Sequence, residues 1–378
     1  MKQYLSDRIN AMEVSATLVM AAKTRELKAE GKDIIGLSLG EPDFDIPDFI
    51  KEAAIEAIQQ NYSKYTPIDG YLELREAICE KFKRDNNLNY KPSQIVVSTG
   101  AKQCLANVAL AMLNPGDEVI FPAPYWVSYK EIAKMAGGVP IEVHTTIENN
   151  FKITPAQLEA AITSKTKIVW FNTPCNPSGS IYSKAELEAL AVVLRKYPHI
   201  FILSDEIYEY INFTNERVTS VAEIDSLYER TITVNGMSKA FAMTGWRIGY
   251  MGAPEWISKA CAKVQGQVTS GTNAIAQRAS IAALKAPKSK IQYMVDEFKR
   301  RRDLVLQLLN EIEGFKLNIP EGAFYVFPDI SSFFGKTLRG RVINNATDFS
   351  LYLLEEAMVA TVTGEAFGDA NCIRFSYA

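Results

Sequence analysis

Short runs of β-branched and apolar residues alternate with helical stretches through most of this 378-residue chain. The strand candidates cover residues 95–98, 118–121, 139–143, 167–171, 200–203, 231–234 and 248–252, and helical patterns cover 102–113, 128–135, 184–195 and 255–264. This alternation predicts an α/β fold with a doubly wound, mostly parallel sheet. Ligands of such sheets bind beyond the carboxyl ends of the strands, and Gly100, Asn176, Asp205 and Lys239 each follow a strand candidate.

The pattern changes after about Asn273. A long helical stretch over residues 289–313 leads to short strands around 324–327 and 373–375. A chain of 378 residues exceeds the usual size of a single hydrophobic core. We therefore predict a large unit over residues 46–272 and a smaller α+β unit formed by residues 1–45 plus 273–378.

Composition limits the classes of partner. The net charge is −3, with no block of basic residues, so nucleic acids and membrane surfaces are not expected as partners. The first residues lack an apolar signal core, and no apolar run approaches the ~20 residues of a membrane span, so we expect a cytoplasmic protein. With two histidines, five scattered cysteines and no Cys-x-x-Cys pair, no metal site is expected.

The segment after the 231–234 strand carries Ser238, Lys239 and Arg247 among glycines and apolar residues. A free lysine titrates near ~10.4, but burial lowers the pKa and lets the amine attack a carbonyl. An arginine close by suits a phosphate. An aldehyde that carries a phosphate matches pyridoxal 5′-phosphate. The alternative is a surface lysine beside an ion-paired arginine.

Two further segments follow strands in the same way. Gly100 allows a tight turn, and the free amides of Ala101 and Lys102 then open a helix, which makes an anion site. Asp205 lies at a strand end, with Tyr208 one helical turn later; a carboxylate there would keep a pyridine nitrogen protonated. For the Gly100 turn, the alternative is an ordinary strand–helix connection. For Asp205 and Tyr208, the alternative is a helix cap followed by a core tyrosine.

Other candidates are weaker when taken singly. Asn176 presents an amide in a loop rich in proline and glycine, and Trp126 offers an aromatic face for stacking. Tyr65 and Arg374 offer a phenol and a guanidinium. The alternatives are a plain turn for Asn176 and core packing for Trp126. For Tyr65 the alternative is a surface turn, and for Arg374 an ion pair.

Taken in order, these motifs resemble the class I (fold type I) pyridoxal-phosphate aminotransferases, most closely the bacterial aspartate aminotransferase branch. The resemblance runs from about Leu5 to the end of the chain. Its most specific pieces are Gly40-Glu-Pro-Asp-Phe44, Lys64-Tyr-Thr-Pro67, Pro124-Tyr-Trp126, Asn176-Pro-x-Gly179, Ser204-Asp-Glu-Ile-Tyr208, Ser238-Lys239 and Thr244-Gly-Trp-Arg-Ile-Gly249.

The resemblance implies pyridoxal 5′-phosphate as cofactor and transamination with ping-pong kinetics. It assigns catalytic roles to Lys239, which should bond to the cofactor's aldehyde, to Asp205 on the pyridine nitrogen, and to Tyr208 on the ring oxygen with Asn176. It implies stacking by Trp126 and a phosphate site made by the Gly100 turn, the amides of Ala101 and Lys102, Ser238 and Arg247. It also implies a homodimer, because Tyr65 should reach the neighbouring subunit's phosphate.

For the substrate, the resemblance implies that Arg374 binds the α-carboxylate, with Gly40, Asn176 and Trp126 beside it. Lys102, Ser15 and Thr17 should engage an acidic side chain, so aspartate and glutamate are expected first. The same residues fit a glutamate– or aspartate–prephenate enzyme, and aromatic substrates stay open. An inactive, ligand-binding regulator is a further alternative, which the intact Lys239 and Asp205 disfavour.

Two positions depart from the family pattern. Gly236 stands three residues before the lysine, where related enzymes often have serine, so one hydroxyl contact is missing. The chain stops at Ala378, where relatives usually continue with a helix, so either this copy is truncated or its smaller unit is abbreviated.

Overall fold

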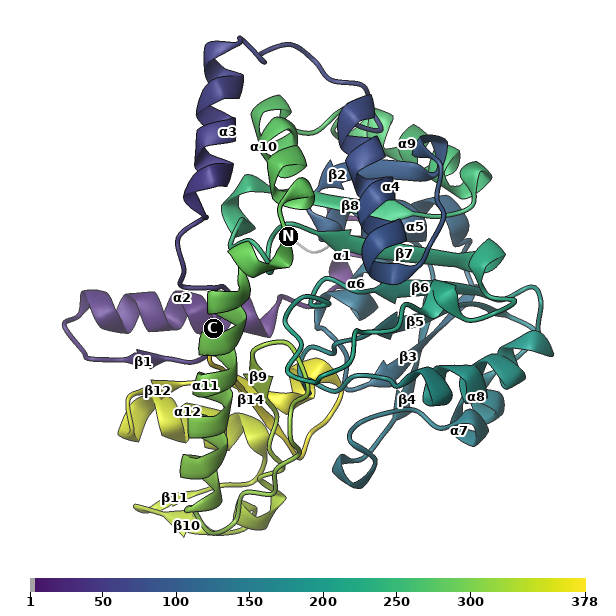
Figure 1. Cartoon of the computed structure of the whole chain (residues 1–378). Coiled ribbons are helices and arrows are strands. Elements are labelled where there is room, and N and C mark those ends of the chain that lie inside the picture. Colours follow the sequence, from purple (N-terminus) through teal and green to yellow (C-terminus); the bar gives the residue numbers. More distant parts are fainter. Residues whose placement is uncertain (1–3) are drawn as a thin grey trace.

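The computed structural model describes residues 4–378 and confirms the α/β fold with a mostly parallel sheet (Figure 1). In spatial order, the seven strands of the central sheet are β2 (Ile95–Thr99), β8 (Ile248–Gly252), β7 (Thr231–Gly236), β6 (Phe201–Asp205), β5 (Thr166–Asn172), β3 (Glu118–Ala123) and β4 (Val139–His144). Strands β7, β6, β5, β3 and β4 are paired in parallel, and β8 is antiparallel to both β2 and β7. Each strand matches a run identified from the sequence.

Both faces of the sheet are covered, which explains why the strands read as continuous apolar runs. On one face, Val119, Phe121 and Trp170 share a core with α5 (Ala101–Met112), α6 (Ser128–Met135) and α9 (Glu255–Val268). On the other face, Ile120 and Val169 share a core with α7 (Pro155–Ala161) and α8 (Lys184–Arg195). Successive side chains of a strand point to opposite faces, so neighbours such as Val119 and Ile120 enter different cores.

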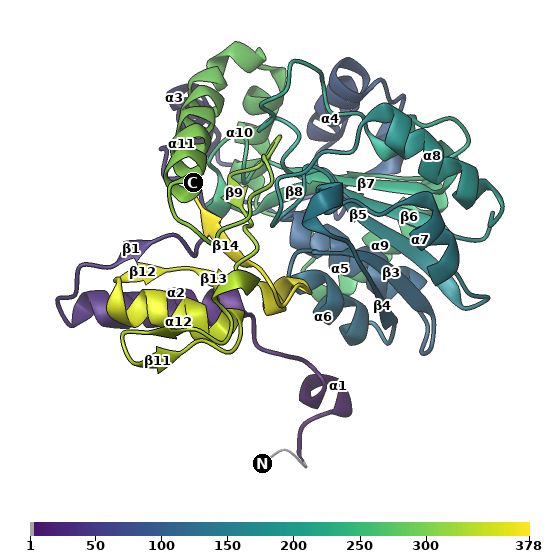
Figure 2. The same cartoon turned by 90° about the horizontal axis from the view of Figure 1, so that it is seen from below.

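A third group of helices packs around the β2 end of the sheet (Figures 1 and 2). It consists of α3 (Asp48–Gln59), α4 (Leu72–Asn86) and α10 (Ala274–Lys285), and α10 packs against both of the others. The division after residue 272 stays a proposal, and the packing of α10 favours placing the boundary after this helix.

Most of the remaining elements form a second body beside the sheet (Figure 2). Its helices are α2 (Ala16–Ala29), α11 (Gln292–Asn310) and α12 (Ala346–Glu356), whereas the short helix α1 (Asp7–Asn10) contacts α6. Its strands are β1 (Ile35–Gly36) paired with β12 (Val359–Ala360), the hairpin β10 (Thr337–Leu338) and β11 (Arg341–Val342), and the sheet β13 (Val362–Thr363), β14 (Ile373–Ser376) and β9 (Tyr325–Val326). Helix α11 is shorter than the predicted 289–313 stretch, because a turn that ends at Gly314, with φ 109°, follows it. None of the helices within residues 4–378 is long and apolar enough to cross a membrane.

Candidate active site

A cavity of about 250 Å³ lies where the carboxyl ends of β5, β6 and β7 meet strand β14 of the second body. Most of the residues singled out from the sequence line it: Thr17, Gly40, Ala101, Lys102, Trp126, Asn176, Asp205, Tyr208, Ser238, Lys239, Arg247 and Arg374. They come from segments spread over the whole chain, so the fold brings together groups that the sequence keeps far apart.

Lys239 lies three residues beyond β7, and its Nζ donates a hydrogen bond to the carbonyl oxygen of Gly40 at 2.6 Å. The pKa of Lys239 is lowered to about 8, chiefly by burial and to a smaller extent by the nearby guanidinium groups of Arg374 and Arg247, while Glu41 acts in the opposite direction. About a tenth of the amine is therefore unprotonated at pH 7, far more than for a free lysine, and attack on a carbonyl requires this form.

Asp205 ends strand β6 and is buried, with 3% of its surface exposed. The hydroxyl of Tyr129 donates to its Oδ2 at 2.7 Å, and the amide of Ile207 donates to its Oδ1 at 3.2 Å. Burial raises the pKa of Asp205 to about 6, and no cation within residues 4–378 lies at ion-pair distance from it. A bound cation beside this carboxylate would offset the cost of burying its charge.

Behind Asp205, amide and phenol groups fix the neighbouring loops. The side-chain amide of Asn172, at the end of β5, donates to the carbonyl of Asp205 at 2.9 Å. The Asn172 oxygen accepts the backbone N–H of Asn176 at 2.7 Å, so the loop that carries Asn176 is tied to the sheet edge. Tyr208 and Tyr325 share a hydrogen bond between their hydroxyls at 2.8 Å.

The N-terminus of α5 and Arg247 form one positively polarised corner of the cavity. Gly100 precedes the helix at φ 84°, and a Cβ at this position would clash with the guanidinium of Arg247. Arg247 donates to the carbonyl of Thr244 at 2.8 Å, and among the described residues no carboxylate pairs with it. Amides at a helix start together with a guanidinium make a site for a phosphate.

Arg374 is the most deeply buried cation of the cavity, with 1% of its surface exposed. Its guanidinium donates to Asn176 Oδ1 at 3.0 Å and to the Ser38 carbonyl at 2.6 Å, and lies 4.5 Å from the centre of the Tyr325 ring. Its Nε has no hydrogen-bond partner, and no carboxylate in residues 4–378 forms an ion pair with it. A buried guanidinium without a counter-ion is a site for a carboxylate ligand.

At the other side of the cavity, Lys102 and Thr17 are also available to a ligand. The Nζ of Lys102 lies 4.7 Å from the ring centre of Trp126, and burial together with Arg247 lowers the pKa of Lys102. The hydroxyl of Thr17 is buried without a hydrogen-bond partner within the described residues. Ser15 lies instead in a neighbouring groove of about 740 Å³, which Lys102 and Arg247 also line.

Tyr65 does not reach the cavity of its own chain. It is 99% exposed, in the loop between α3 and α4.

Gly236, where related enzymes often have serine, is enclosed by the neighbouring strand: a Cβ there would lie 2.9 Å from the carbonyl of Ile248. The glycine that lacks this hydroxyl therefore allows β7 and β8 to lie close together.

Sequence reasoning missed Tyr129, Asn172, Tyr325 and Ser38. Tyr129 could have been suspected, because it stands three residues after Trp126 at the start of a helix, and Asn172 because it directly ends a strand. Ser38 contributes only its backbone carbonyl to Arg374, which no side-chain pattern reveals.

The α/β fold thus carries a cavity with a partly buried lysine of lowered pKa, a positively polarised corner that suits a phosphate (the phosphate corner) and a buried arginine without a carboxylate partner among the described residues. Residues 32–378 match the family model of class I and II aminotransferases. The chain is 50% identical to an aspartate/prephenate aminotransferase of Cereibacter sphaeroides, over 99% of this chain and 94% of the relative.

Solved structures agree with this assignment. The aspartate aminotransferase of Rhizobium meliloti superposes with a TM-score of 0.96 at 46% identity, over 99% of this chain and 94% of the other. The aspartate aminotransferase of Thermus thermophilus with maleate superposes with a TM-score of 0.93 at 42% identity, again over 99% of this chain and 94% of the other. The chain belongs to the class I and II aminotransferases. It is an aminotransferase, which confirms the family and the reaction expected from the sequence.

Proposed function

We propose that this aminotransferase uses pyridoxal 5′-phosphate and exchanges amino groups between aspartate or glutamate and 2-oxo acids. The observation that carries the proposal is Arg374, a buried guanidinium without a counter-ion in the same cavity as Lys239 and Asp205. Lys102 and Thr17 line this cavity too and have no carboxylate partner within residues 4–378. The names of the relatives, aspartate and aspartate/prephenate aminotransferases, support the same class of substrate.

The residues present fit this cofactor. Asp205 would hold the ring nitrogen, Tyr208 and Asn176 the ring oxygen, and Trp126 the ring face. Gly100, the amides of Ala101 and Lys102, Ser238 and Arg247 would hold the phosphate. When bound, the cofactor supplies an electron-withdrawing ring that accepts the electrons of the substrate's Cα–H bond.

The chain's own groups then divide the work. Arg374 orients the substrate by its α-carboxylate, with Gly40 and Asn176 alongside. Lys239 would hold the cofactor by its aldehyde and, when free, would take the proton from the substrate's Cα. A lysine with a pKa of about 8 both accepts and returns a proton readily near neutral pH.

Prephenate, or an aromatic amino acid, is the second candidate. The groove of about 740 Å³ that adjoins the cavity at Lys102 and Arg247 includes apolar side chains such as Val127 and Ile132, and it offers room for a larger side chain.

A ligand-binding regulator without activity is disfavoured, because Lys239 and Asp205 are both present in the cavity. All five cysteines are free, which supports the proposed cytoplasmic location.

Lys102→Ala is expected to lower kcat/KM for aspartate and glutamate by roughly 1.5–3 kcal/mol, the usual worth of a hydrogen bond to a charged group. Neutral amino acids should be nearly unaffected. The measurement is a panel of amino donors with 2-oxoglutarate as acceptor, for the native chain and the variant.

Lys130→Ala serves as the matched control, because Lys130 lines the neighbouring groove, pairs with Glu142 at 2.7 Å and stays outside the cavity. An equal loss for alanine and aspartate in Lys102→Ala would remove the support for acidic substrates. A native enzyme that prefers aromatic donors or prephenate would move the second candidate ahead.

We further propose that two chains form a symmetric dimer in which Tyr65 reaches the partner's phosphate corner. Tyr65 is exposed, and so are Ile55, Ile58 and Ile68 on the adjoining helix and loop. Exposed apolar groups gathered in this way are typical of a subunit interface.

Mixing Tyr65→Ala chains with Lys239→Ala chains tests this arrangement. The mixed dimer has one intact site, because the Lys239→Ala chain lends its Tyr65 to the neighbour. Random mixing should then restore about a quarter of the native sites. Activity that stays at the level of the unmixed variants, or a fully active native monomer, would return Tyr65 to the role of a turn residue.

A further inference from the structure

The turn that follows β6 presents different side chains to its two sides. Asp205 and Tyr208 line the cavity, whereas Glu206 and Glu209 do not, although they are only 0% and 8% exposed. Buried carboxylates are rare unless partners hold them. Two buried carboxylates within four residues, directly behind the site, therefore indicate that specific partners hold this turn.

Glu206 binds the turn to the neighbouring loop. Its Oε1 accepts three hydrogen bonds: from the hydroxyls of Ser204 and Ser220, each at 2.8 Å, and from the amide of Val221 at 3.2 Å. Ser204 belongs to β6, and Val221 opens the short helix η4 (Val221–Glu223). Burial and the nearby Glu209 raise the pKa of Glu206 to about 7.

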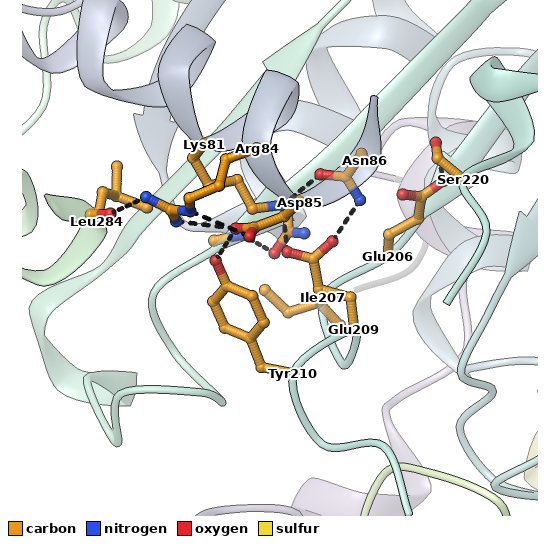
Figure 3. A network of polar contacts seen from close by, with 12 residues as sticks. Lys81, Arg84, Asp85, Asn86, Glu206, Ile207, Glu209, Tyr210, Ser220 and Leu284 are labelled. Carbon is orange, nitrogen blue, oxygen red and sulfur yellow. Dashed lines mark hydrogen bonds and ion pairs between the residues drawn. The ribbon is translucent and has the colours of Figure 1, made fainter. Parts of the chain in front are cut away.

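Glu209 binds the same turn to helix α4, as Figure 3 shows. Its Oε2 accepts the side-chain amide of Asn86 at 2.7 Å, and its Oε1 forms an ion pair with Lys81. Lys81 in turn donates to Asn86 Oδ1 at 2.7 Å. The three side chains close a buried triangle between the turn and the last two turns of α4.

These two anchors bracket the groups that face the cavity. The amide of Ile207, directly after Glu206, donates to Asp205 Oδ1 at 3.2 Å. The amide of Glu206 itself donates to the Val234 carbonyl at 2.8 Å, and Tyr208 lies between the two acids. Movement of residues 206–209 would therefore withdraw a donor from Asp205 and displace the Tyr208 hydroxyl from Tyr325.

We propose that Glu206 and Glu209 are positioning residues, which fix the cavity-facing orientation of Asp205 and Tyr208 by anchoring the turn to η4 and α4. The functional consequence rests on the proposed function, in which Asp205 and Tyr208 hold the cofactor ring. The anchoring itself is a property of the chain without cofactor, and so the two claims are tested separately.

Hydrogen exchange on the cofactor-free chain tests the anchoring. Glu206→Met removes the accepting oxygen at similar size, Glu206→Gln keeps that oxygen, and Glu188→Gln is the exposed control. Glu206→Met should speed exchange of segment 205–211 by about tenfold or more, because three buried hydrogen bonds are lost. Segment 95–99 should be unchanged, and Glu206→Gln should stay close to the native chain. Unchanged exchange of 205–211 in Glu206→Met, or an equal rise in every segment, would overturn the proposal.

The loaded enzyme gives a second readout. With added pyridoxal 5′-phosphate, Glu206→Met should shift the pH midpoint of the bound cofactor's absorbance and weaken cofactor binding, and Glu206→Gln should restore both. Native values of both quantities in Glu206→Met would overturn the proposal. If the native chain binds no pyridoxal phosphate, the proposed function fails, while the exchange experiment still judges the anchoring.

Discussion

Lys239→Ala is expected to abolish turnover, with a loss of more than about 10³-fold in kcat, because in the proposed reaction one amine would serve as both nucleophile and proton carrier. The chain should still fold, since within residues 4–378 the Lys239 side chain makes a single hydrogen bond, to the Gly40 carbonyl. It should also still bind the cofactor through the phosphate corner, without a covalent link. Steady-state transamination and the unfolding midpoint of the variant measure both expectations.

Lys184→Ala is a suitable control, because Lys184 is exposed at the start of α8 and does not line the cavity. This control should keep native activity. Near-native transamination by Lys239→Ala would contradict the role assigned to the lysine. Loss of folding in the same variant would instead mean that burying this amine supports the structure.

Asp205→Ala should lower kcat by roughly 10²–10³-fold, or about 3–4 kcal/mol, which is typical when one preorganised electrostatic group is removed from a site. The physical reason is the buried carboxylate itself, whose pKa burial raises to about 6 and which a cationic ring nitrogen would hold ionised. Cofactor should still bind through its phosphate. The measurement is single-turnover kinetics, so that substrate binding and the chemical step are separated.

Asp205→Asn separates charge from shape. Asparagine keeps one acceptor oxygen for the Ile207 amide, and its NH2 group can donate to the Tyr129 hydroxyl, whose O–H can rotate away. The turn should therefore stay in place while the negative charge is lost. We expect Asn and Ala at this position to have similar effects on the chemical step. A loss of less than about tenfold in either variant, or ~1.4 kcal/mol, would show that Asp205 is not the partner of the ring nitrogen.

Local patterns in the sequence were enough to predict the seven strands of the central sheet, although six of them end one or two residues later than predicted. Lys167-Ile-Val-Trp-Phe171 and Thr231-Ile-Thr-Val234 are apolar and β-branched because both sides of the strands are buried. Asp205 and Lys239 lie beyond such runs, where a parallel sheet places its ligands. These positions follow from the period of the side chains and need no knowledge of distant contacts.

What the sequence did not predict depends on contacts between distant segments. Tyr129 donates to Asp205 from 76 residues away, and no local pattern records that pairing. Arg374 is buried because Tyr325 and Phe367 pack against its guanidinium at 4.5 and 4.8 Å from their ring centres. The burial of Glu206 and Glu209 is visible only in the fold, where η4 and α4 supply their partners.

Locating the cofactor on the chain tests the central claim most directly. The purified chain is incubated with pyridoxal 5′-phosphate, reduced with borohydride, digested and analysed by mass spectrometry. A single modified peptide that carries the cofactor on Lys239, together with a visible chromophore before reduction, is the expected result. Modification spread over surface lysines, or no chromophore at all, would contradict the assignment of this cavity as the site of transamination.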